Sequence, residues 1–542
     1  MATMAKKPAA RPAGGDNKRM VYALVAGSAI LTSLSFVPYN LFPLGFISLL
    51  PLFYLFEHFA PTTRRLFALW AVFTLILNLI GYHWIMHTIA VYGMMPTAAA
   101  FPLFLLYSLG TGGKMLLFFF FLRFMQRRTD LFNTNGKKIA AVPAAFAICE
   151  LVGWQLFPWH GGNIVSGDLW FAQAADLIGT RGLSVLWVLL QYLLYLAAKD
   201  FFAGKRPAIL SFVRQNRALQ FFAAALILIH LYGAVRVADF ADREQAAPKI
   251  LVGVPQGNVP LITSYHERPY IITRMLGQTQ KLVADAAAAG RRPDLVVWPE
   301  SSIPAMEFER SETLRAAIND LQRSTQTPLI INDILHEAAQ RRDYSNMWHL
   351  NAEGTPLNNY QKNFLLPFGE FMPLGDTFPV LKNLFPAVSD FSHGKRYSLF
   401  NISSGAGNVK AMPLICYEVI LPEYARGFDN KTMKEAQFII NITNDAWFGK
   451  SVESLQHMTL GVMRAIELRL PIVRATNSGI SAYIASTGVV SGETPMFERV
   501  NQVYSVPAMP RTVTLFAIAG NLPLYVYLVL AVLLIWFRRN KK

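Results

Sequence analysis

The stretch from residue 411 to residue 424 reads AMPLICYEVILPEY, and its central residues set the interpretation of the whole chain. An apolar run ends at Cys416, and Tyr417 and Glu418 follow at once. A short continuous apolar run of this kind is typical of a buried strand. The pattern therefore predicts a thiol at the carboxyl end of a strand, with a carboxylate two positions further on. Cys149, the other cysteine of the chain, lies inside a different apolar run, so we expect no disulfide.

The composition around this stretch indicates a membrane protein with a large domain outside the membrane. The mean hydropathy of the 542 residues is +0.31, and 15% of them are charged, against about 25% in soluble globular proteins. The apolar excess lies in residues 20–236 and 514–537, whereas residues 249–513 have the pattern of a soluble α/β domain. The net charge of +16 comes largely from short basic clusters between apolar runs, so we expect no nucleic-acid partner.

Eight apolar stretches have about the 20 residues that a membrane span needs. They are residues 20–37, 41–59, 66–86, 99–122, 139–157, 183–199, 217–236 and 514–537. We expect no cleavable signal peptide, because the first stretch lacks a small-residue cleavage site and a second stretch follows almost immediately. Lys114 lies within the fourth stretch, where it must either extend to the interface or face protein.

The distribution of lysine and arginine predicts the orientation of these spans. Basic residues cluster in the N-terminal tail, in the loops after the second, fourth and sixth spans and at the C-terminus, while the opposite short loops hold only Arg181. Basic loops stay in the cytoplasm. The predicted organisation is a cytoplasmic tail (1–19), seven spans (20–236), an external α/β domain (245–513), a last span (514–537) and a second cytoplasmic tail (538–542).

The external domain alternates strand and helix signals. Strands are expected at residues 249–258, 294–300, 328–333, 409–416, 438–445, 471–476 and 480–485, with a hairpin at 347–362 that turns at Glu353–Gly354. Helices are expected at residues 266–290, 312–325 and 452–469. Apolar strands separated by helices imply a sheet that is covered on at least one face. Residues 374–398 show no period, which suits either a mobile loop or ordinary packed surface.

Three reactive side chains follow predicted strands: Glu300, Lys362 and Cys416. Ligands of α/β sheets gather beyond the carboxyl ends of strands. Together these groups could catalyse acyl transfer, because the thiol can attack a carbonyl, the carboxylate can take its proton and the ammonium can stabilise the oxyanion and favour the thiolate. Taken singly, the same residues could be a helix cap, a surface charge and a buried small side chain, and spacing does not choose between these interpretations.

Four motifs in order along the chain resemble the successive motifs of the nitrilase superfamily. They are VVWPESSIP (296–304), YQKNFLLPFGEFMP (360–373), ICYEVILPE (415–423) and NITNDAWFGKSVESLQH (441–457). Together with the predicted spans, they resemble the membrane branch of that superfamily, the apolipoprotein N-acyltransferase family. The resemblance implies a four-layer αββα sandwich and a catalytic set of Glu300, Lys362 and Cys416.

The resemblance also implies supporting residues. Glu370 of the PFGE motif would be a second active-site carboxylate that positions Lys362, Tyr417 and Glu418 would shape the pocket, and Asn346 would be a structural asparagine. The backbone N–H of Tyr417 would complete an oxyanion hole. The sequence departs from the family at two positions: Tyr265 stands where tryptophan is frequent, and Leu470 stands where arginine is common, with Arg469 one place earlier. These departures bear on substrate contacts rather than on the catalytic set.

The function implied by the resemblance is transfer of an acyl chain from a phospholipid, with phosphatidylethanolamine as the expected donor. The chain would pass through a thioester on Cys416 to the α-amino group of the diacylglyceryl-cysteine of an apolipoprotein. No metal or cofactor is expected, and the protein would lie in the bacterial inner membrane with its catalytic domain in the periplasm. Two alternatives stay open: a membrane-tethered nitrilase-type amidase, and a non-catalytic membrane assembly factor.

The predicted orientation can be tested with reporter fusions. A reporter after residue 245 should be active in the external compartment, and reporters after residues 130 and 542 should be active in the cytoplasm, because the basic loops hold those segments inside. A cytoplasmic signal from the fusion at residue 245 would contradict the orientation.

Overall fold

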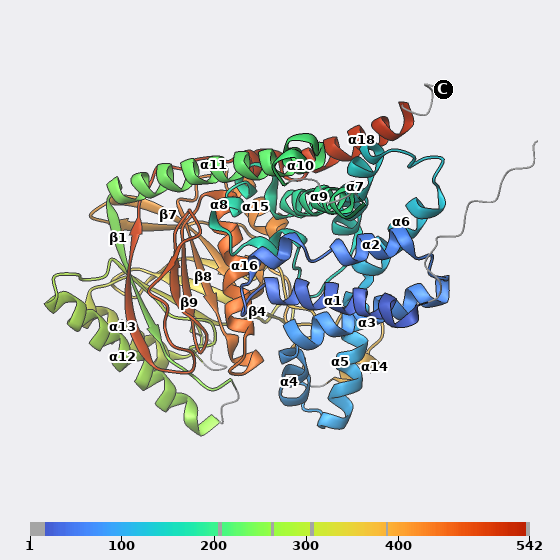
Figure 1. The fold of residues 1–542 in the computed structure, drawn as a ribbon. Coiled ribbons are helices and arrows are strands. Elements are labelled where there is room, and N and C mark those ends of the chain that lie inside the picture. Colours follow the sequence, from blue (N-terminus) through green and yellow to red (C-terminus); the bar gives the residue numbers. More distant parts are fainter. Residues whose placement is uncertain (1–16, 204–208, 262–264, 304–307, 386–387, 538–542) are drawn as a thin grey trace, which may run out of the picture.

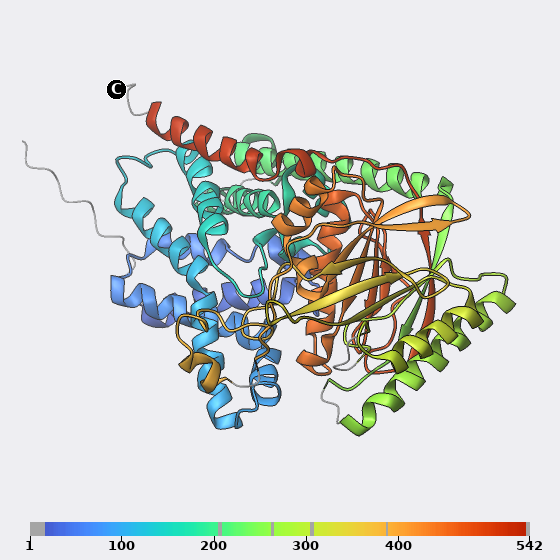
Figure 2. The same cartoon turned by 180° about the vertical axis from the view of Figure 1, so that it is seen from behind.

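The computed structural model of the chain describes residues 17–203, 209–261, 265–303, 308–385 and 388–537. A helical half formed mainly by residues 18–203 lies beside an α/β half formed by residues 249–507 (Figure 1). The view from behind shows the same two halves in contact along one side (Figure 2). A 30-residue helix, α11 (Arg217–Ala246), leads from the helical half to the first strand and runs along both halves (Figure 1).

Each predicted span coincides with a helix or with a pair of helices. The helical elements are α1 (Lys18–Ser35), η1 (Phe42–Phe46), α2 (Leu50–His58), α3 (Thr63–Gly81), α4 (Trp84–Val91), α5 (Thr97–Thr111), α6 (Gly113–Arg127), α7 (Asn135–Val152), η2 (Gly161–Val165), α8 (Leu169–Ala172), α9 (Ala175–Ala203), α10 (Ile209–Gln215), α17 (Leu515–Ala519) and α18 (Leu522–Phe537). Within the described residues, three helices are long and apolar enough to cross a membrane, namely α3, α9 and α11, and four candidates result if the bent pair α5–α6 counts as one span. The eight-span count is therefore not confirmed.

The predicted fourth span, residues 99–122, is not one continuous helix. It divides at Gly112 into α5 and α6, which are bent by 45° relative to each other. The indole nitrogen of Trp70 donates to the carbonyl of Gly112 at 2.8 Å, and a Cβ at Gly112 would meet the Thr74 side chain at 2.4 Å. The bend thus packs directly against α3, and only glycine allows the approach.

The α/β half contains two six-stranded sheets. The first has the order β12-β1-β2-β3-β4-β5, formed by β12 (Val500–Pro507), β1 (Lys249–Gln256), β2 (Leu295–Val297), β3 (Leu329–Glu337), β4 (Arg342–Leu350) and β5 (Pro356–Gln361). The second has the order β11-β10-β9-β8-β7-β6, formed by β11 (Val490–Ser491), β10 (Ala482–Ile484), β9 (Ile472–Thr476), β8 (Phe438–Thr443), β7 (Gly407–Ile415) and β6 (Phe400–Ser404). The predicted strands and the hairpin are confirmed, whereas β6, β11 and β12 were not anticipated.

Alternation along the strands explains how the sheets pack. Leu295 and Val297 of β2 belong to the core that the two sheets share, while Val296 packs with α12 (Arg268–Ala288) and α13 (Glu312–Thr325) on the outer side. Successive strand residues point to opposite faces, so a fully apolar strand requires a layer on each side. On the second sheet, α15 (Pro422–Lys431) and α16 (Glu453–Leu468) supply that layer, and α16 lies between the sheet and the helical half (Figure 1). This is the αββα arrangement that the resemblance implies.

Buried ion pairs connect the two halves. Arg469, which ends α16 in a left-handed conformation, donates to Asp176 at the start of α9 at 2.7 Å and to the side chain of Gln173 at 2.7 Å. Arg236 on α11 reaches the same Asp176 oxygen at 2.9 Å. Two guanidinium groups therefore share one carboxylate that is 1% exposed, and three segments meet there. A buried carboxylate requires such partners, because its desolvation is costly.

Replacement of Arg469 by methionine, which keeps much of the side-chain volume, should destabilise the contact between the halves. Removing one partner of a buried ion pair costs about 3 to 5 kcal/mol, and the lower end is expected here because Arg236 still faces Asp176. Denaturation of the purified protein in mixed micelles measures the change. The control Lys281→Ala breaks an exposed pair with Asp285 and should leave stability unchanged.

Candidate active site

The three predicted reactive side chains meet at the carboxyl ends of strands. In the first sheet β2 runs parallel to β3, and β5 has the same direction because two antiparallel steps separate it from β3. Glu300 follows β2 and Lys362 follows β5, so both leave the sheet at the same edge. Cys416 follows β7 of the second sheet.

Lys362 lies between the two carboxylates of the site. Its Nζ lies 2.7 Å from Oε1 of Glu370 and 3.5 Å from Oε1 of Glu300, and its side chain is 1% exposed. The other oxygen of Glu370 accepts the backbone N–H of Leu366 at 2.7 Å, which fixes that carboxylate within its own loop. Oε2 of Glu300 has no hydrogen-bond partner among the described residues and can therefore take a proton. The structure thus brings Glu370 to Lys362, as the resemblance implies.

The backbone at Cys416 adopts an unusual conformation. Its φ is +50°, and the 3₁₀ turn η4 (Cys416–Ile420) begins at this residue. Ser301, directly after Glu300, also has a positive φ of +61° and is held by the side chain of Asn332. Non-glycine residues at such angles cost about 1 to 3 kcal/mol each, and they concentrate at functional sites. The chain therefore turns sharply after each of these two reactive residues and leaves the side chain at the end of the strand.

Glu418 joins the cysteine turn to the lysine loop. Oε1 accepts the backbone N–H groups of Asn363 at 2.7 Å and Phe364 at 2.9 Å, directly after Lys362. Oε2 accepts the backbone N–H of Ile415 at 2.9 Å, directly before Cys416. The hydroxyl of Tyr360 donates to the same carboxylate at 2.8 Å. Glu418 is fully buried, so its role in this structure is to fix the two loops relative to each other rather than to line the pocket.

Burial and charge set the protonation of the site. Burial raises the pKa of Glu300 to about 7, against the opposing effect of the Lys362 ammonium. Burial alone would lower the pKa of Lys362, but the neighbouring carboxylates of Glu370 and Glu300 outweigh it and raise that pKa. Burial and the Glu300 charge raise the pKa of the Cys416 thiol well above its usual value. The Lys362 cation does favour the thiolate, as the sequence predicts, but burial and the Glu300 charge outweigh it, so the thiol needs a base.

A cavity beside Cys416 is closed by side chains from both halves. Cys416, Tyr417, Leu366 and other residues of the α/β half line one side, and Tyr82, Trp84 and Phe157 of the helical half line the other. Trp84 donates from its indole nitrogen to Gln456 at 3.0 Å, and Tyr417 donates from its hydroxyl to the carbonyl of Leu156. The reactive thiol therefore lies under an aromatic wall that the helical half supplies.

Family models match both halves of the chain. Residues 252–505 match the carbon-nitrogen hydrolase family model, and residues 28–193 match the apolipoprotein N-acyltransferase N-terminal domain. Apolipoprotein N-acyltransferase of Bdellovibrio bacteriovorus is 29% identical over 487 residues, which cover 87% of this chain and 85% of that protein. The enzyme of the same name from Vibrio cholerae is 28% identical over 527 residues, which cover 94% of this chain and 96% of that protein. The chain belongs to the apolipoprotein N-acyltransferase family. Among solved structures, an amidase from Nesterenkonia sp. aligns with 52% of this chain and 96% of its own length at 16% identity, with a TM-score of 0.36.

Membership of the apolipoprotein N-acyltransferase family makes this chain an acyltransferase. The structure also places two buried residues at the site that the sequence patterns did not single out. Tyr360 stands two positions before Lys362 and is fully buried against Glu418. His457, the last residue of the fourth motif, approaches the carbonyl oxygen of Cys416 with Nε2 at 3.3 Å. Both residues lie inside the quoted motifs, so the signal was present, but nothing in the sequence specified which groups they would contact.

Of the other residues singled out in the sequence of this acyltransferase, Asn346 and Arg469 make contacts that stabilise the fold, and the side chain of Tyr265 is not described. Asn346 is buried on β4, where its side chain donates to Asp333 at 3.3 Å and accepts from Asn359 at 3.0 Å, which supports a structural role. Tyr265 begins a 3₁₀ turn (Tyr265–Glu267), but its side chain lies outside the described residues. Arg469 pairs with Asp176 away from the catalytic set.

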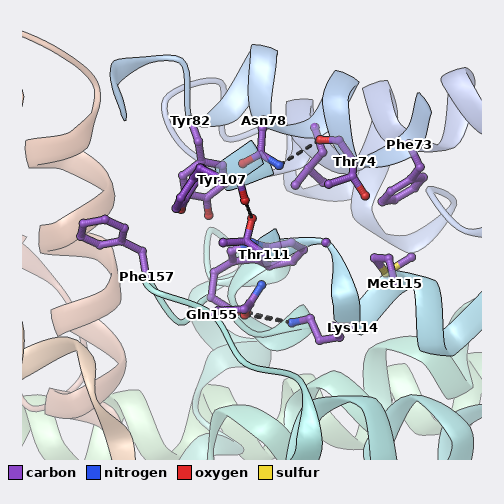
Figure 3. A pocket seen from close by; sticks show the side chains of 13 residues that line it. Phe73, Thr74, Asn78, Tyr82, Tyr107, Thr111, Lys114, Met115, Gln155 and Phe157 are labelled. Carbon is purple, nitrogen blue, oxygen red and sulfur yellow. Dashed lines mark hydrogen bonds between the residues drawn. The ribbon is translucent and has the colours of Figure 1, made fainter. Parts of the chain in front are cut away.

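A second pocket of the acyltransferase lies in the helical half and shares Tyr82 and Phe157 with the cavity beside Cys416 (Figure 3). Lys114 lines this pocket and donates to Gln155 at 3.3 Å (Figure 3). It also donates to the carbonyl of Trp159 at 2.9 Å. Glu150 lies 3.5 Å from the same ammonium, which is 2% exposed. Of the two environments that the sequence allows for Lys114, the structure shows a lysine that faces protein.

Glu418→Gln should disrupt the site without changing its size. The four groups that meet the carboxylate are all donors, so the amide NH₂ of glutamine must face one of them. An unmatched buried polar contact costs about 1 to 3 kcal/mol or more. We expect a lower thermal midpoint and loss of acyl transfer together, whereas Glu435→Gln at an exposed position should change neither. Normal transfer by the Glu418→Gln protein would contradict the structural role.

Proposed function

We propose that this chain transfers an acyl chain from a membrane phospholipid, through a thioester on Cys416, to the α-amino group of the diacylglyceryl-cysteine of an apolipoprotein. The observation that carries the proposal is the buried Lys362, held by Glu370 beside the unpaired oxygen of Glu300 at the carboxyl ends of the strands. The aromatic wall over Cys416 supports a substrate with apolar chains. The names of the relatives support the same acceptor.

The first half-reaction forms the thioester. The sulfur of Cys416 attacks the ester carbonyl carbon while Oε2 of Glu300 takes the thiol proton, which the raised pKa of Cys416 makes necessary. The oxyanion is stabilised by the Lys362 ammonium and by the backbone N–H of Tyr417. The carbon–oxygen bond then breaks, Glu300 returns the proton to the departing glycerol oxygen, and a lysophospholipid leaves.

The second half-reaction transfers the acyl chain. The neutral α-amine of the acceptor attacks the thioester carbonyl, and Glu300 takes one proton from the nitrogen. The carbon–sulfur bond breaks, and the same proton returns to the Cys416 sulfur. An amide and a free thiol result, so the enzyme is restored. A pKa of about 7 suits Glu300 to both steps, because a general base works best when its pKa lies near the working pH.

Surface features support access from a lipid bilayer. The helix α11 is exposed along most of its length and presents Phe221, Leu228 and Val235 to the surroundings. The short helix α14 (Val380–Leu384) and its approach carry further exposed apolar side chains, including Phe378 and Leu384. Large exposed apolar surfaces mark contacts with protein or membrane. We infer that both segments contact lipid, and that residues 374–398 contribute to substrate entry.

We further propose the placement in the inner membrane that the basic loops predict. Residues 20–236 and 514–537 supply eight spans, both termini are cytoplasmic, and residues 245–513 form the periplasmic catalytic domain. Phosphatidylethanolamine is the proposed donor. The described helices, with three to four strong span candidates, support a membrane protein, and the basic loops support its orientation.

Purified protein incubated with phospholipid should gain the mass of one acyl group on Cys416. Cys416→Ser should fold and stay in the membrane but fail to complete turnover, because an alkoxide is harder to form and an oxygen ester resists amines. Cys149→Ser, in α7 of the helical half, is the matched control and should remain active. Intact-mass measurement checks both proteins. Full acyl transfer by Cys416→Ser would rule out the covalent intermediate.

The rate of thioester formation should follow the ionisation of Glu300. Because its pKa is raised to about 7, the carboxyl is protonated and inactive below pH 7, and the rate should rise through pH 7 and level above about pH 8. Glu300→Gln should react at least about a hundredfold more slowly and lose that inflection. Single-turnover assays across this pH range measure both. A wild-type rate that keeps rising above pH 9 would instead indicate control by the thiol.

A further inference from the structure

A carboxyl group that the proposed mechanism does not use lies at the cavity beside Cys416. Glu453 is the first residue of α16, is 3% exposed and lines the cavity together with Cys416 and Tyr417. Its Oε2 has no hydrogen-bond partner among the described residues. Buried polar atoms are nearly always paired, so an unpaired carboxyl oxygen at a substrate cavity points to a ligand.

The neighbours of Glu453 leave its charge unbalanced. His457 Nδ1 lies 3.6 Å from Oε1 of Glu453 and 3.2 Å from Oδ1 of Asp445. Arg474 pairs with the other oxygen of Asp445 at 2.8 Å, and its attraction for Glu453 is smaller than the opposing effects of burial and Asp445. Burial, followed by repulsion from Asp445, raises the pKa of Glu453 well above its usual value. A cation that entered the cavity would stabilise the carboxylate form of Glu453 and lower this pKa.

Two kinds of cation fit a carboxylate in this position. The donor atoms of Asp445, Glu453 and His457 lie within 4.8 Å of one another, which would allow a metal ion. However, the Arg474 guanidinium bound to Asp445 would repel a divalent ion at that place about twice as strongly as a monovalent one. An ammonium group needs only hydrogen-bond acceptors, and Oε2 of Glu453 supplies one without disturbing the pair between Asp445 and Arg474.

The acyl acceptor of the proposed reaction brings such a group. A free α-amino group has a pKa of about 7.7 to 8.0, so it arrives largely as an ammonium ion. It must lose one proton before it can attack the thioester, and a second proton leaves during the attack. Glu300 takes the proton that leaves during the attack. The proton that leaves before the attack has no acceptor in the mechanism proposed above.

We propose that Glu453 binds the α-ammonium of the acceptor and takes its first proton, so that a neutral amine attacks the thioester. This role rests on the proposed function. Binding of the cation releases the resting proton of Glu453 to water, and the proton of the ammonium then replaces it. The cycle converts ammonium and thioester to amide, thiol and one released proton, so atoms and charge balance. Glu453 is thus an acid–base group of the second half-reaction only.

The experiment uses the purified full chain in phospholipid micelles and compares wild type, Glu453→Gln and the neighbouring control Ser454→Ala. Thioester formation on Cys416, read by intact mass, should be unchanged within about twofold in both variants. Transfer to a diacylglyceryl-cysteinyl peptide at pH 7 should fall by about a hundredfold in Glu453→Gln. Transfer to hydroxylamine, which is mostly neutral at pH 7, should be unchanged. The deficit with the peptide should shrink as the pH rises to 9.5, because the peptide amine is then neutral without help.

Other outcomes overturn the proposal. Normal peptide transfer by Glu453→Gln, or an equal loss with peptide and hydroxylamine, would leave Glu453 without a role in handling the ammonium. Loss of wild-type peptide transfer after treatment with EDTA would assign the three donors to a metal ion. If wild type forms no thioester at all, the proposed function fails first and the role of Glu453 fails with it, whereas a normal thioester with unchanged peptide transfer removes only Glu453.

Discussion

The carboxylate of Glu418 is the constraint on which the site depends, because it connects turns that emerge from two different sheets. It accepts backbone N–H groups on both sides of the gap, after Lys362 and before Cys416. Among the described residues, the hydrogen bonds of Glu418 go to Tyr360 and to backbone N–H groups rather than to either reactive side chain, yet the position of each follows from it. A backbone held by a buried acceptor moves little, so the thiol and the ammonium keep their separation while large apolar substrates enter and leave.

The charges of the catalytic side chains near Glu418 also depend on one another. Glu370 neutralises Lys362 at short range, so Glu300 remains only weakly paired and keeps a pKa near 7. The same burial that raises the pKa of Glu300 keeps the Cys416 thiol protonated at rest. A protonated thiol is less open to oxidation than a thiolate. The thiol therefore stays unreactive until a substrate is in place. The positive-φ turns at Cys416 and Ser301 keep the reactive side chains at the ends of their strands.

Much of this architecture could be predicted from the sequence, and the exceptions have physical reasons. Apolar strands with clear turn signals, such as β1, β7 and β8, and the hairpin of β4 and β5, agree with the structure. Strand β12 was not anticipated, because its alternation is weak and it exists by pairing with β1 along eight residues. The motifs located Glu300, Lys362 and Cys416, but their pKa values depend on burial and on charges that meet only in the fold. The cavity beside Cys416 is completed by Tyr82, Trp84 and Phe157 from the other half. The bend at Gly112 depends on a contact with Trp70 that no local pattern encodes.

The ion pair between Asp176 and Arg469 has a consequence for the synthesis of the protein. The two residues are 293 positions apart, so at roughly 5 to 20 residues per second about 15 to 60 s separate their emergence from the ribosome. During that interval the Arg469 partner of Asp176 has not yet been made. Arg236, only 60 positions after Asp176, can neutralise it in the meantime. The carboxylate that the two guanidinium groups share can thus be paired before the α/β half is complete, and Arg469 adds a second ion pair once that half has been made.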